Sequence, residues 1–231
     1  MKTAVITGCA RGIGEYLARG FSAAGYQVYG IDLLENPYFQ GDLAEQEDLD
    51  RFVAQIKNEA GTVDVLINNA MQSSGGIETA NYEQFNRALH IGISAPFYLV
   101  QQLRKLFGEG AGVINILSTR MAQSQADTES YSAAKGGLRA LSHALMVSLA
   151  GEVRVNSIVP GWIDTTGSEF GPEDRGQHPS DRVGTPDDIL RAALFLADPG
   201  NRFINGAELY VDGGMSKRMI YHGDEGWTFT P

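Results

Sequence analysis

The sequence is poor in cysteine, in cationic side chains and in long apolar runs. Cys9 is the one cysteine among 231 residues, which excludes an internal disulfide and fits a reducing compartment. Asp and Glu outnumber Lys and Arg by 28 to 18, and the net charge of −10 argues against a nucleic-acid partner, which requires clustered cations. No stretch reaches the roughly 18 uninterrupted apolar residues of a membrane span. These absences predict a cytoplasmic protein that binds neither nucleic acid nor membrane.

Residues that bind metal ions are sparse as well. His90, His143, His178 and His222 are scattered along the chain, and none has a ligand spacing to another histidine or to Cys9. The sequence therefore predicts no metal site. Cys9 lies inside a glycine-rich turn, where it is either a reactive thiol at a helix N-terminus or a small residue packed in a tight turn.

The length and the first residues set the expected organisation. A chain of 231 residues suits one α/β domain, so residues 1–231 are expected to form a single domain. The opening MKTAVITG runs directly into a strand pattern and a glycine turn, which leaves no room for a secretory signal. The expected location is again the cytoplasm.

Short β-type runs alternate with helical patterns along the chain, which is typical of a parallel sheet covered by helices. The pattern predicts an α/β fold with a Rossmann-type doubly wound sheet of about seven mostly parallel strands and helices on both faces. The expected strands cover residues 3–6, 27–32, a short piece ending near Asp42, 63–67, 113–117, 154–161 and 207–211. A helical stretch over 82–107 contains Pro96, which is expected to kink or break it. The last helix is expected to start at Thr185 and Pro186.

Two stretches do not fit the scaffold. Residues 165–183 are polar, punctuated by glycine and without a clear period, and they follow a strand where α/β sheets place ligands, so we expect a substrate lid. Residues 215–231 extend past the last strand and carry Trp227 and Phe229. This tail is expected either to dock on a neighbouring subunit or to fray.

The first turn of the chain has the residues of a phosphate-binding loop. Gly8, Gly12 and Gly14 follow a strand and open a helix, so that backbone amides and the helix dipole face an anion, here a pyrophosphate. Asp32 ends the second strand, where its carboxylate would accept hydrogen bonds from ribose hydroxyls and repel a 2′-phosphate. Arg11 has the opposite effect, because a cation in this turn would attract a 2′-phosphate. The balance favours NAD, with NADP as the weaker alternative.

Tyr131 and Lys135 form a candidate acid–base pair. Four residues apart on a helix, they share one face, so the Lys135 ammonium can approach the surroundings of the Tyr131 hydroxyl. Free tyrosine has a pKa near 10, and work as a base near neutral pH requires a shift of about three units, worth roughly 4 kcal/mol. A cation at about 4 to 5 Å supplies roughly that amount at an effective dielectric constant of about 20. The pair predicts proton transfer to or from a substrate hydroxyl or carbonyl oxygen.

Ordered motifs over nearly the whole chain resemble the short-chain dehydrogenase/reductase family. The motifs are TGxxxGxG at Thr7, Gly8, Gly12 and Gly14, NNA at Asn68, Asn69 and Ala70, the single Ser118, YxxxK at Tyr131 and Lys135, and PG at Pro160 and Gly161. The resemblance implies one dinucleotide-binding and catalytic domain that transfers a hydride between nicotinamide and a secondary alcohol or ketone. It also implies a homodimer or homotetramer.

The resemblance assigns roles to individual residues. Tyr131 is implied as the general acid/base, Lys135 as the residue that binds the nicotinamide ribose and lowers the tyrosine pKa, and Ser118 as the residue that orients the substrate oxygen. The implied cofactor-binding residues are Gly8, Arg11, Gly12, Ile13, Gly14, Asp32, Asp42, Leu43, Asn68, Ala70, Tyr131, Lys135, Pro160, Gly161, Ile163 and Thr165. Asp42 is expected at the adenine and Asn68 beside the ribose, and the carboxamide is assigned to Ile163 and Thr165.

The candidate substrate residues are Met71, Arg120, Trp162 and His178. Arg120, two residues after Ser118, would meet an anionic substrate or take part in an ordinary surface ion pair. Gln72, Gln123, Gln125 and His178 favour a small polar substrate, such as a sugar, a polyol or a hydroxy acid.

Two positions depart from the family pattern. Gly92 stands where an asparagine usually links the lysine, through a water, to a proton relay, and Met71 stands where glycine often follows NNA. Either a water or another residue fills the gap at Gly92, or proton exchange is slower, or activity is lost. His90 is no substitute, because it lies about 200 degrees around a helix from Gly92. The rival interpretations are a nucleotide-binding regulator or weakened paralogue, and a lyase or dehalogenase on the same fold.

Overall fold

A computed structural model describes residues 1–228. Seven strands form one sheet in the order β3-β2-β1-β4-β5-β6-β7, and every neighbouring pair is parallel. The strands are β1 (Lys2–Thr7), β2 (Tyr26–Asp32), β3 (Phe39–Gln40), β4 (Val63–Asn68), β5 (Phe107–Ile116), β6 (Arg154–Pro160) and β7 (Glu208–Val211). The chain winds outward from β1 to β3 and then from β4 to β7, so the strand order reverses between β1 and β4. The predicted doubly wound α/β sheet is confirmed, and it is wholly parallel.

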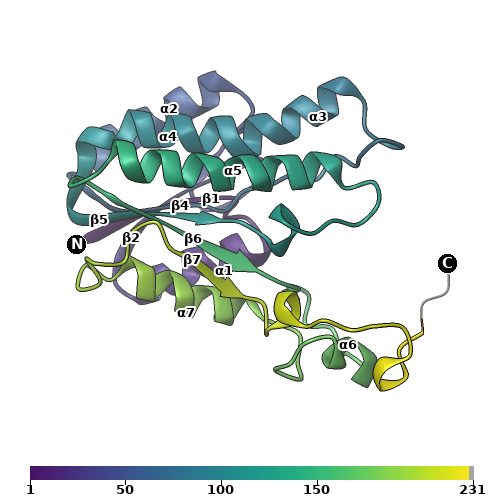
Figure 1. The fold of residues 1–231 in the computed structure, drawn as a ribbon. Helices are drawn as coiled ribbons and strands as arrows, with labels where there is room; N and C mark the ends of the chain where they lie inside the picture. Colours follow the sequence, from purple (N-terminus) through teal and green to yellow (C-terminus); the bar gives the residue numbers. More distant parts are fainter. Residues whose placement is uncertain (229–231) are drawn as a thin grey trace.

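Helices cover both faces of this sheet (Figure 1). One face carries α2 (Gln46–Glu59), α3 (Tyr82–Leu89), α4 (Ala95–Leu103) and α5 (Glu129–Ser148), and the other carries α1 (Gly12–Ala23) and α7 (Pro186–Ala197). Two apolar clusters fill the two layers, one around Phe52 and Leu99 and the other around Phe21 and Ile189. The central strands are buried from both sides, which explains why their apolar residues run almost without interruption, whereas the edge strands β3 and β7 are only partly buried.

The long helical stretch is interrupted, but not at the expected residue. A turn of π-helix at His90–Ser94 separates α3 from α4, and the N–H of Ala95 bonds to the carbonyl of His90, five residues back. Pro96 follows directly as the second residue of α4 and cannot donate a hydrogen bond to the carbonyl of Gly92. The wider turn therefore absorbs the missing bond before the proline rather than at it.

The fifth strand begins earlier than the sequence predicts. We expected residues 113–117, whereas β5 starts at Phe107, and Val63 and Val65 of β4 pair with Phe107 and Gly112. The bulge between these pairs absorbs glycine-rich residues that carry no apolar alternation, and Gly110 has a φ of +79°. Because glycine has no side chain, these residues show no alternation of apolar and polar side chains, and the start of the strand could not be recognised in the sequence.

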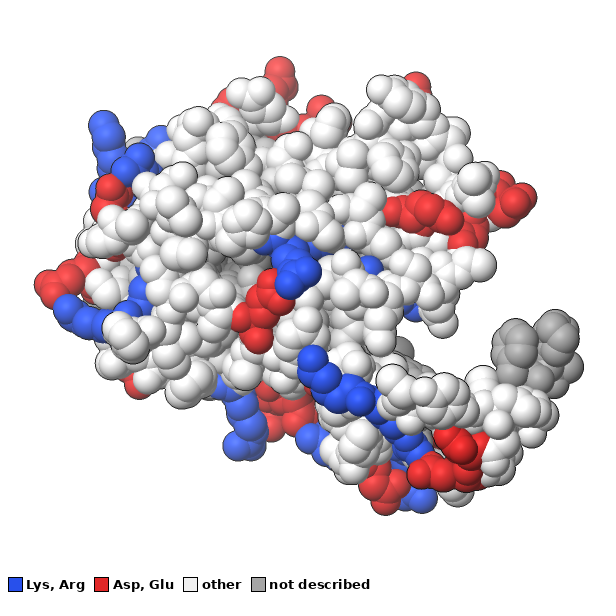
Figure 2. All heavy atoms as spheres, in the orientation of Figure 1, with Lys and Arg blue, Asp and Glu red and all other residues white. Residues whose placement is uncertain are grey.

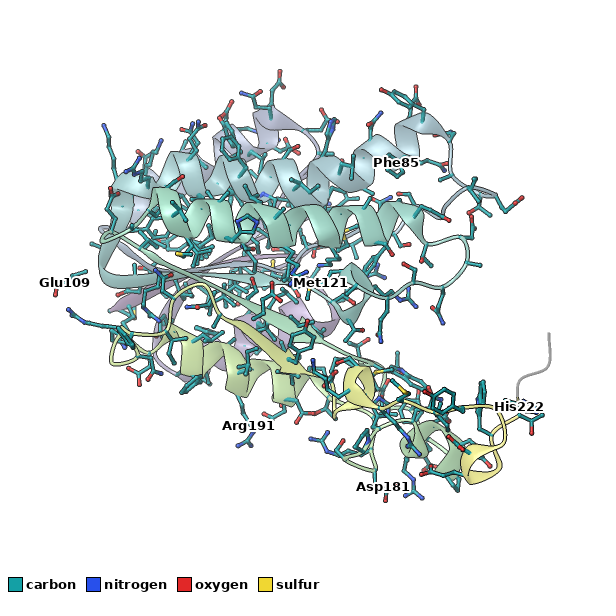
Figure 3. All side chains as sticks on the ribbon, in the orientation of Figure 1. Phe85, Glu109, Met121, Asp181, Arg191 and His222 are labelled. Atoms are coloured by element: carbon teal, nitrogen blue, oxygen red, sulfur yellow. The ribbon has the colours of Figure 1, made fainter. Side chains whose placement is uncertain are left out.

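Beyond the sheet, the segment predicted to be a lid lies next to the tail. The lid segment 165–183 contains the short helix α6 (Pro172–Gly176), and Arg218 of the tail donates to the carbonyl of Gly176 and pairs with Glu225. Figure 3 labels Asp181 of the lid and His222 of the tail on the same side of the molecule, away from Met121 under α5. Phe229, expected to act with Trp227 in the tail, lies outside the described residues.

Residues 1–228 contain neither a candidate membrane span nor a candidate metal cluster. None of the helices there combines the length and the apolar composition that a bilayer crossing needs. No group of three or more His, Cys, Asp or Glu side chains in that part of the chain is arranged to hold a metal ion.

Candidate active site

The carboxyl ends of the parallel strands bring most of the predicted site residues to one edge of the sheet. The glycine turn follows β1, Asp32 ends β2, Asn68 ends β4, Ser118 follows β5, and Pro160 ends β6. Figure 2 shows the surface hollowed beside this edge, between the arm formed by lid and tail and the rest of the molecule. In doubly wound sheets, ligands bind at this edge, near the point where the strand order reverses.

Two glycines of this turn, Gly8 and Gly14, have no space for a side chain. Gly8 has a φ of +71°, and a Cβ atom there would lie 2.8 Å from Cα of Ala70. A Cβ atom at Gly14 would lie 1.7 Å from the carbonyl oxygen of Gly8. Glycine is required at both positions, because any other residue would push α1 away from β1 and β4.

Two residues of the motifs, Thr7 and Asn69, hold this turn in place, a role that was not predicted for them. The Thr7 hydroxyl accepts hydrogen bonds from the N–H groups of Asn69 and Ala70, at 3.0 Å each. The Asn69 amide donates to the carbonyls of Thr7 at 2.9 Å and Gly8 at 3.2 Å. These bonds tie the end of β1 to the end of β4. Their positions inside the two motifs were the only sequence signal.

The residues at this turn fit a pyrophosphate. Arg11, the residue that precedes α1, is extended at φ −156° and gives the helix no side-chain cap. The first N–H groups of α1 are therefore not capped by the side chain that usually satisfies them, and the helix dipole favours an anion there. Ile13 lies in this first turn and packs partly against the second apolar cluster.

Asp32 lies next to the glycine turn, as its position predicts. One carboxylate oxygen accepts the N–H of Ala10 and the other accepts the N–H of Leu34, both at 2.9 Å. These bonds fix the carboxylate at the end of β2. The residue after Asp32 is Leu33, which is 52% exposed and uncharged, so no positive charge lies there to attract a 2′-phosphate.

Asp42 has a partner that the sequence did not reveal. Its carboxylate forms a 2.7 Å ion pair with Arg87 of α3 and accepts the N–H of Ala44 at 2.9 Å. Arg87 also donates to the Gln72 side chain at 3.1 Å. Arg87 thus links the expected adenine end to the loop after β4. No spacing rule connects residues 45 positions apart, so sequence reasoning missed it.

Asn68 is enclosed rather than placed at the mouth of the site. Only 2% of it is exposed, and its amide donates to Asn115 at 2.7 Å, which in turn donates to Ser142 at 2.8 Å. The other atom of the Asn68 amide, Oδ1, is buried and has no partner among residues 1–228. The side chain joins β4 to β5 and α5, and its contact with a ribose stays a prediction.

Tyr131 and Lys135 lie together on α5 as their spacing predicts. The Lys135 ammonium is 5.7 Å from the centre of the Tyr131 ring and donates to the carbonyl of Ile116 at 2.6 Å. Lys135 is 2% exposed. Burial disfavours its charged form and lowers the pKa of Lys135 from 10.5 to about 8.

Ser118 and Arg120 lie at the same place. The Ser118 hydroxyl accepts the N–H of Arg120 at 3.2 Å and keeps its own proton for a further acceptor. The Arg120 guanidinium lies 5.7 Å from the centre of the Tyr131 ring. Its side-chain partner is the neutral amide of Gln125, and no carboxylate within residues 1–228 pairs with it. The surface ion pair expected as the alternative is therefore not formed there.

The lid is closed at its base by backbone bonds. Asp164 donates to the carbonyl of Gly184 at 2.9 Å, and Gly184 donates to the carbonyl of Trp162 at 3.0 Å, so the ends of segment 165–183 lie side by side. Thr165 reaches the glycine turn, since a Cβ atom at Gly12 would lie 3.5 Å from its methyl carbon. Thr165 thus lies beside the glycine turn, while the contacts of Ile163 and Thr165 with the carboxamide stay a prediction.

The two aromatic candidates for the substrate lie in the lid layer. Trp162 packs edge-on against Phe170 at 5.2 Å between ring centres, and His178 lies 6.1 Å from Trp162. Trp162 is 36% exposed, whereas His178 is 3% exposed and contacts the carbonyl of Asp174 at 3.2 Å through Nδ1. The structure thus leaves Trp162 accessible and buries His178 inside the lid.

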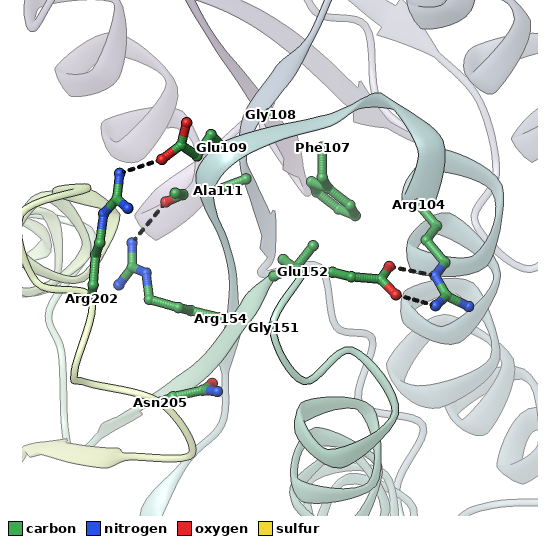
Figure 4. A pocket seen from close by; sticks show the side chains of 12 residues that line it. Arg104, Phe107, Gly108, Glu109, Ala111, Gly151, Glu152, Arg154, Arg202 and Asn205 are labelled. Carbon is green, nitrogen blue, oxygen red and sulfur yellow. Dashed lines mark hydrogen bonds and ion pairs between the residues drawn. The ribbon is translucent and has the colours of Figure 1, made fainter.

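A groove of about 570 Å³ lies away from this site, at the amino ends of β5 and β6 (Figure 4). Its cations already have partners. Arg104 pairs with Glu152 and Arg202 pairs with Glu109, while the terminal nitrogens of the buried Arg154 donate to backbone carbonyls. Size alone does not make this groove the functional site.

The chain resembles proteins that are already known along nearly its whole length. A family model described as enoyl-(acyl carrier protein) reductase matches residues 8–216. An uncharacterized oxidoreductase of Thermotoga maritima is 37% identical, with 95% of this chain and 98% of that protein covered. A 2-dehydro-3-deoxy-D-gluconate 5-dehydrogenase of Pseudoalteromonas atlantica is 30% identical, with 94% and 96% covered.

Solved structures have the same fold. An apo SCOR enzyme of Clostridium thermocellum matches with a TM-score of 0.94 at 41% identity, over 100% of this chain and 99% of that one. A ligand-free aldohexose dehydrogenase of Thermoplasma acidophilum matches with a TM-score of 0.88 at 26% identity, over 97% of each chain.

The chain belongs to the short-chain dehydrogenase/reductase family. It is accordingly an NAD(P)-dependent oxidoreductase that acts on CH–OH groups of a small molecule. The family resemblance of the motifs is confirmed.

Proposed function

We propose that the chain is an NAD(H)-dependent oxidoreductase that interconverts a hydroxyl and a ketone on a sugar-derived acid. The observation that carries this substrate class is Arg120, whose guanidinium lies beside the Tyr131 ring without a carboxylate partner within residues 1–228. A guanidinium binds a carboxylate with strong, charge-assisted hydrogen bonds. The name of the Pseudoalteromonas relative, a dehydrogenase of 2-dehydro-3-deoxy-D-gluconate, supports an acidic sugar derivative.

The chain's own residues handle the proton and the orientation of the substrate. In the reducing direction, Tyr131 gives its hydroxyl proton to the carbonyl oxygen, and the Ser118 O–H donates a hydrogen bond to the same oxygen as negative charge develops. The Lys135 ammonium, held by the carbonyl of Ile116, favours the tyrosinate left behind. The nicotinamide, when bound, supplies or takes up the hydride.

The preference for NAD rests on charge at the end of β2. The Asp32 carboxylate is fixed by two backbone N–H groups, where it repels a 2′-phosphate and suits ribose hydroxyls. Arg11 is exposed in the turn and is the cation that would favour NADP. The half-exposed Leu33 offers no second cation. NAD is therefore the proposed cofactor, and NADP the weaker one.

The wider organisation is proposed on the same basis. Residues 1–231 act as one domain in the cytoplasm, with segment 165–183 as a substrate lid. The proposed assembly is a homodimer or homotetramer. Phe97 of α4 and Val147 of α5 are 46% and 67% exposed, and few charged side chains cover this face in Figure 2. Light scattering of the purified protein tests the assembly, because a monomer at micromolar concentration would contradict it.

The test of the substrate class is a comparison of acidic and neutral substrates with wild type and Arg120→Gln. Loss of a charge-assisted bond should raise KM for keto-sugar acids by about 10- to 100-fold and leave neutral ketoses nearly unchanged. Arg104→Gln, far from the site and paired with Glu152, is the matched control. Equal loss on acidic and neutral substrates would remove Arg120 from carboxylate binding. NADH binding without turnover on any carbonyl would favour the nucleotide-binding regulator.

A further inference from the structure

The π-helical turn between α3 and α4 is docked directly on the catalytic helix. A Cβ atom at Gly92 would lie 2.9 Å from Cβ of Ala134, and a Cβ atom at Gly137 would lie 2.3 Å from Cδ1 of Ile93. Gly92 of the π-helical turn and Gly137 of α5 thus both lie in the contact, and the two segments are too close for a side chain at either position. Figure 1 shows α5 running alongside α3 and α4 at this contact.

Met71 closes the third side of the same contact. Its sulfur would lie 3.0 Å from a Cβ atom at Gly92, at the limit of close packing. Met71 directly follows the Asn69 and Ala70 amides that hold the glycine turn. The loop after β4 therefore touches both the nucleotide-binding turn and, through Gly92, the catalytic helix.

The contact lies at the catalytic residues themselves. Ala134, which Gly92 faces, precedes Lys135, and Tyr131 lies one helical turn earlier on α5. Lys135 is buried, with its ammonium on the carbonyl of Ile116. A shift of α5 by a few tenths of an ångström at Ala134 would move both catalytic side chains relative to the end of β5. Packed interiors transmit such shifts because they have few voids to absorb them.

We propose that Met71 and Gly92 act as a matched pair that positions Tyr131 and Lys135, with the Met71 thioether filling the space that a side chain at position 92 would need. This inference rests on the proposed oxidoreductase function. Gly92 and Met71, the two departures from the family pattern, then belong to one packing contact. Position 92 has no side chain because Met71 and Ala134 already fill the space that a side chain would occupy. Met71 is a positioning residue, since it acts on the catalytic pair through Gly92 and Ala134.

The test is a double-mutant cycle of Gly92→Ala and Met71→Ala. An added methyl group at 92 overpacks the contact and should lower kcat by about tenfold or more in wild type. In the Met71→Ala background the same methyl group still meets Cβ of Ala134 but has room on the Met71 side, so the loss of kcat should be about threefold or more smaller than in wild type. Met71→Leu keeps the volume and should stay within about threefold of wild type.

A matched control and two further measurements separate positioning from simple stability. Gly136→Ala adds the same methyl group on the catalytic helix, where the nearest atom is the Met121 carbonyl oxygen at 4.0 Å, and should leave kcat near wild type. Nucleotide affinity should change less than kcat in all variants, because the shift would reach the expected cofactor site only at its ribose end, through Tyr131 and Lys135. The pH–rate profile should move in Met71→Ala and not in Gly136→Ala, since α5 would relax at Ala134, the neighbour of the buried Lys135.

Two results would overturn the pairing. One is an equal loss of kcat for Gly92→Ala in both backgrounds. The other is a lower unfolding temperature with unchanged kcat and pH profile, which would make the contact structural only. The proposed function fails separately, if wild type binds NADH yet reduces no carbonyl. In that case the packing of the pair can still be tested by stability: if the changes in unfolding free energy of Met71→Ala and Gly92→Ala simply add, the two residues do not act as a pair. The positioning role in catalysis would fail together with the function.

Discussion

The two edges of the sheet differ in how their polar groups are used. At the amino edge, which has the spacious groove, Arg104 and Arg202 are each paired with a glutamate, and the charges are neutralised within the protein. At the carboxyl edge, Arg120 has a neutral partner and Ser118 keeps a proton to donate. The edge whose polar groups keep hydrogen-bonding capacity for a ligand is the candidate site.

The strongest way to test this contrast is to remove the proton carrier at the carboxyl edge. Tyr131→Phe deletes one hydroxyl and should lower kcat by about a thousandfold, the usual effect of losing a general acid. Nucleotide affinity, followed by nicotinamide fluorescence, should change little, because the ring and Lys135 remain. Retained turnover would remove Tyr131 from proton transfer.

The second largest effect is expected for the pH dependence of stability, which the buried Lys135 at this edge should cause. The pKa of Lys135 falls from 10.5 to about 8 on burial, a shift worth roughly 3 kcal/mol. The unfolded chain binds more protons between these pH values, so the free energy of unfolding should rise as pH increases from about 8 to about 10.5. Below pH 8 the full destabilisation is present.

Lys135→Met is the reference protein for this measurement. Urea unfolding of wild type and variant across pH 7 to 11 should show wild type gaining stability relative to the variant above about pH 8. Parallel curves would show that Lys135 is not desolvated in the folded protein. The variant should also lose turnover.

A smaller effect is expected from the nucleotide end of the same edge. Asp32→Ala removes the repulsion of a 2′-phosphate and the acceptor for ribose hydroxyls, so the preference for NADH over NADPH should fall by about 10- to 100-fold. Titration with both nucleotides measures it. Because Asp32 also binds Ala10 and Leu34, thermal unfolding of Asp32→Asn serves as the control for a loosened turn. An unchanged ratio would assign the preference elsewhere.

The smallest effect is expected at the amino edge. Arg104→Gln breaks an exposed ion pair with Glu152, and such pairs contribute little in water. Turnover on any substrate should stay within about twofold of wild type. A large loss of activity would mean that the two edges communicate and would undo the contrast between them.

The sequence predicted what the backbone imposes. Glycine at position 14, the alternation of elements and the spacing of Tyr131 and Lys135 each follow from local geometry, and the structure has all three. Contacts between distant segments were not predictable. The pair Asp42–Arg87 joins residues far apart in the chain, and only the folded chain brings the Met71 sulfur to Gly92.

Three predictions failed where the sequence carries little local information, or where the residue type alone does not determine the structure. The start of β5 was placed too late because its glycines carry no pattern, and the helix interruption was assigned to Pro96 although the π turn precedes it. His178 was expected at the substrate as one of the polar residues of the predicted lid and substrate side, yet it is 3% exposed. Burial depends on the tertiary fold, which a single residue type does not report.

The backbone hydrogen bonds between residues 162–164 and Gly184 join the two ends of segment 165–183, and we call this junction the neck. Because the two ends of segment 165–183 meet at this neck, its interior can change in length or composition while β6 and α7 keep their places. Doubling a loop whose ends are already joined costs only about 0.6 kcal/mol in closure entropy. The neck is thus a junction at which relatives could exchange the proposed lid, which would diversify the substrate range while the nucleotide site is inherited unchanged.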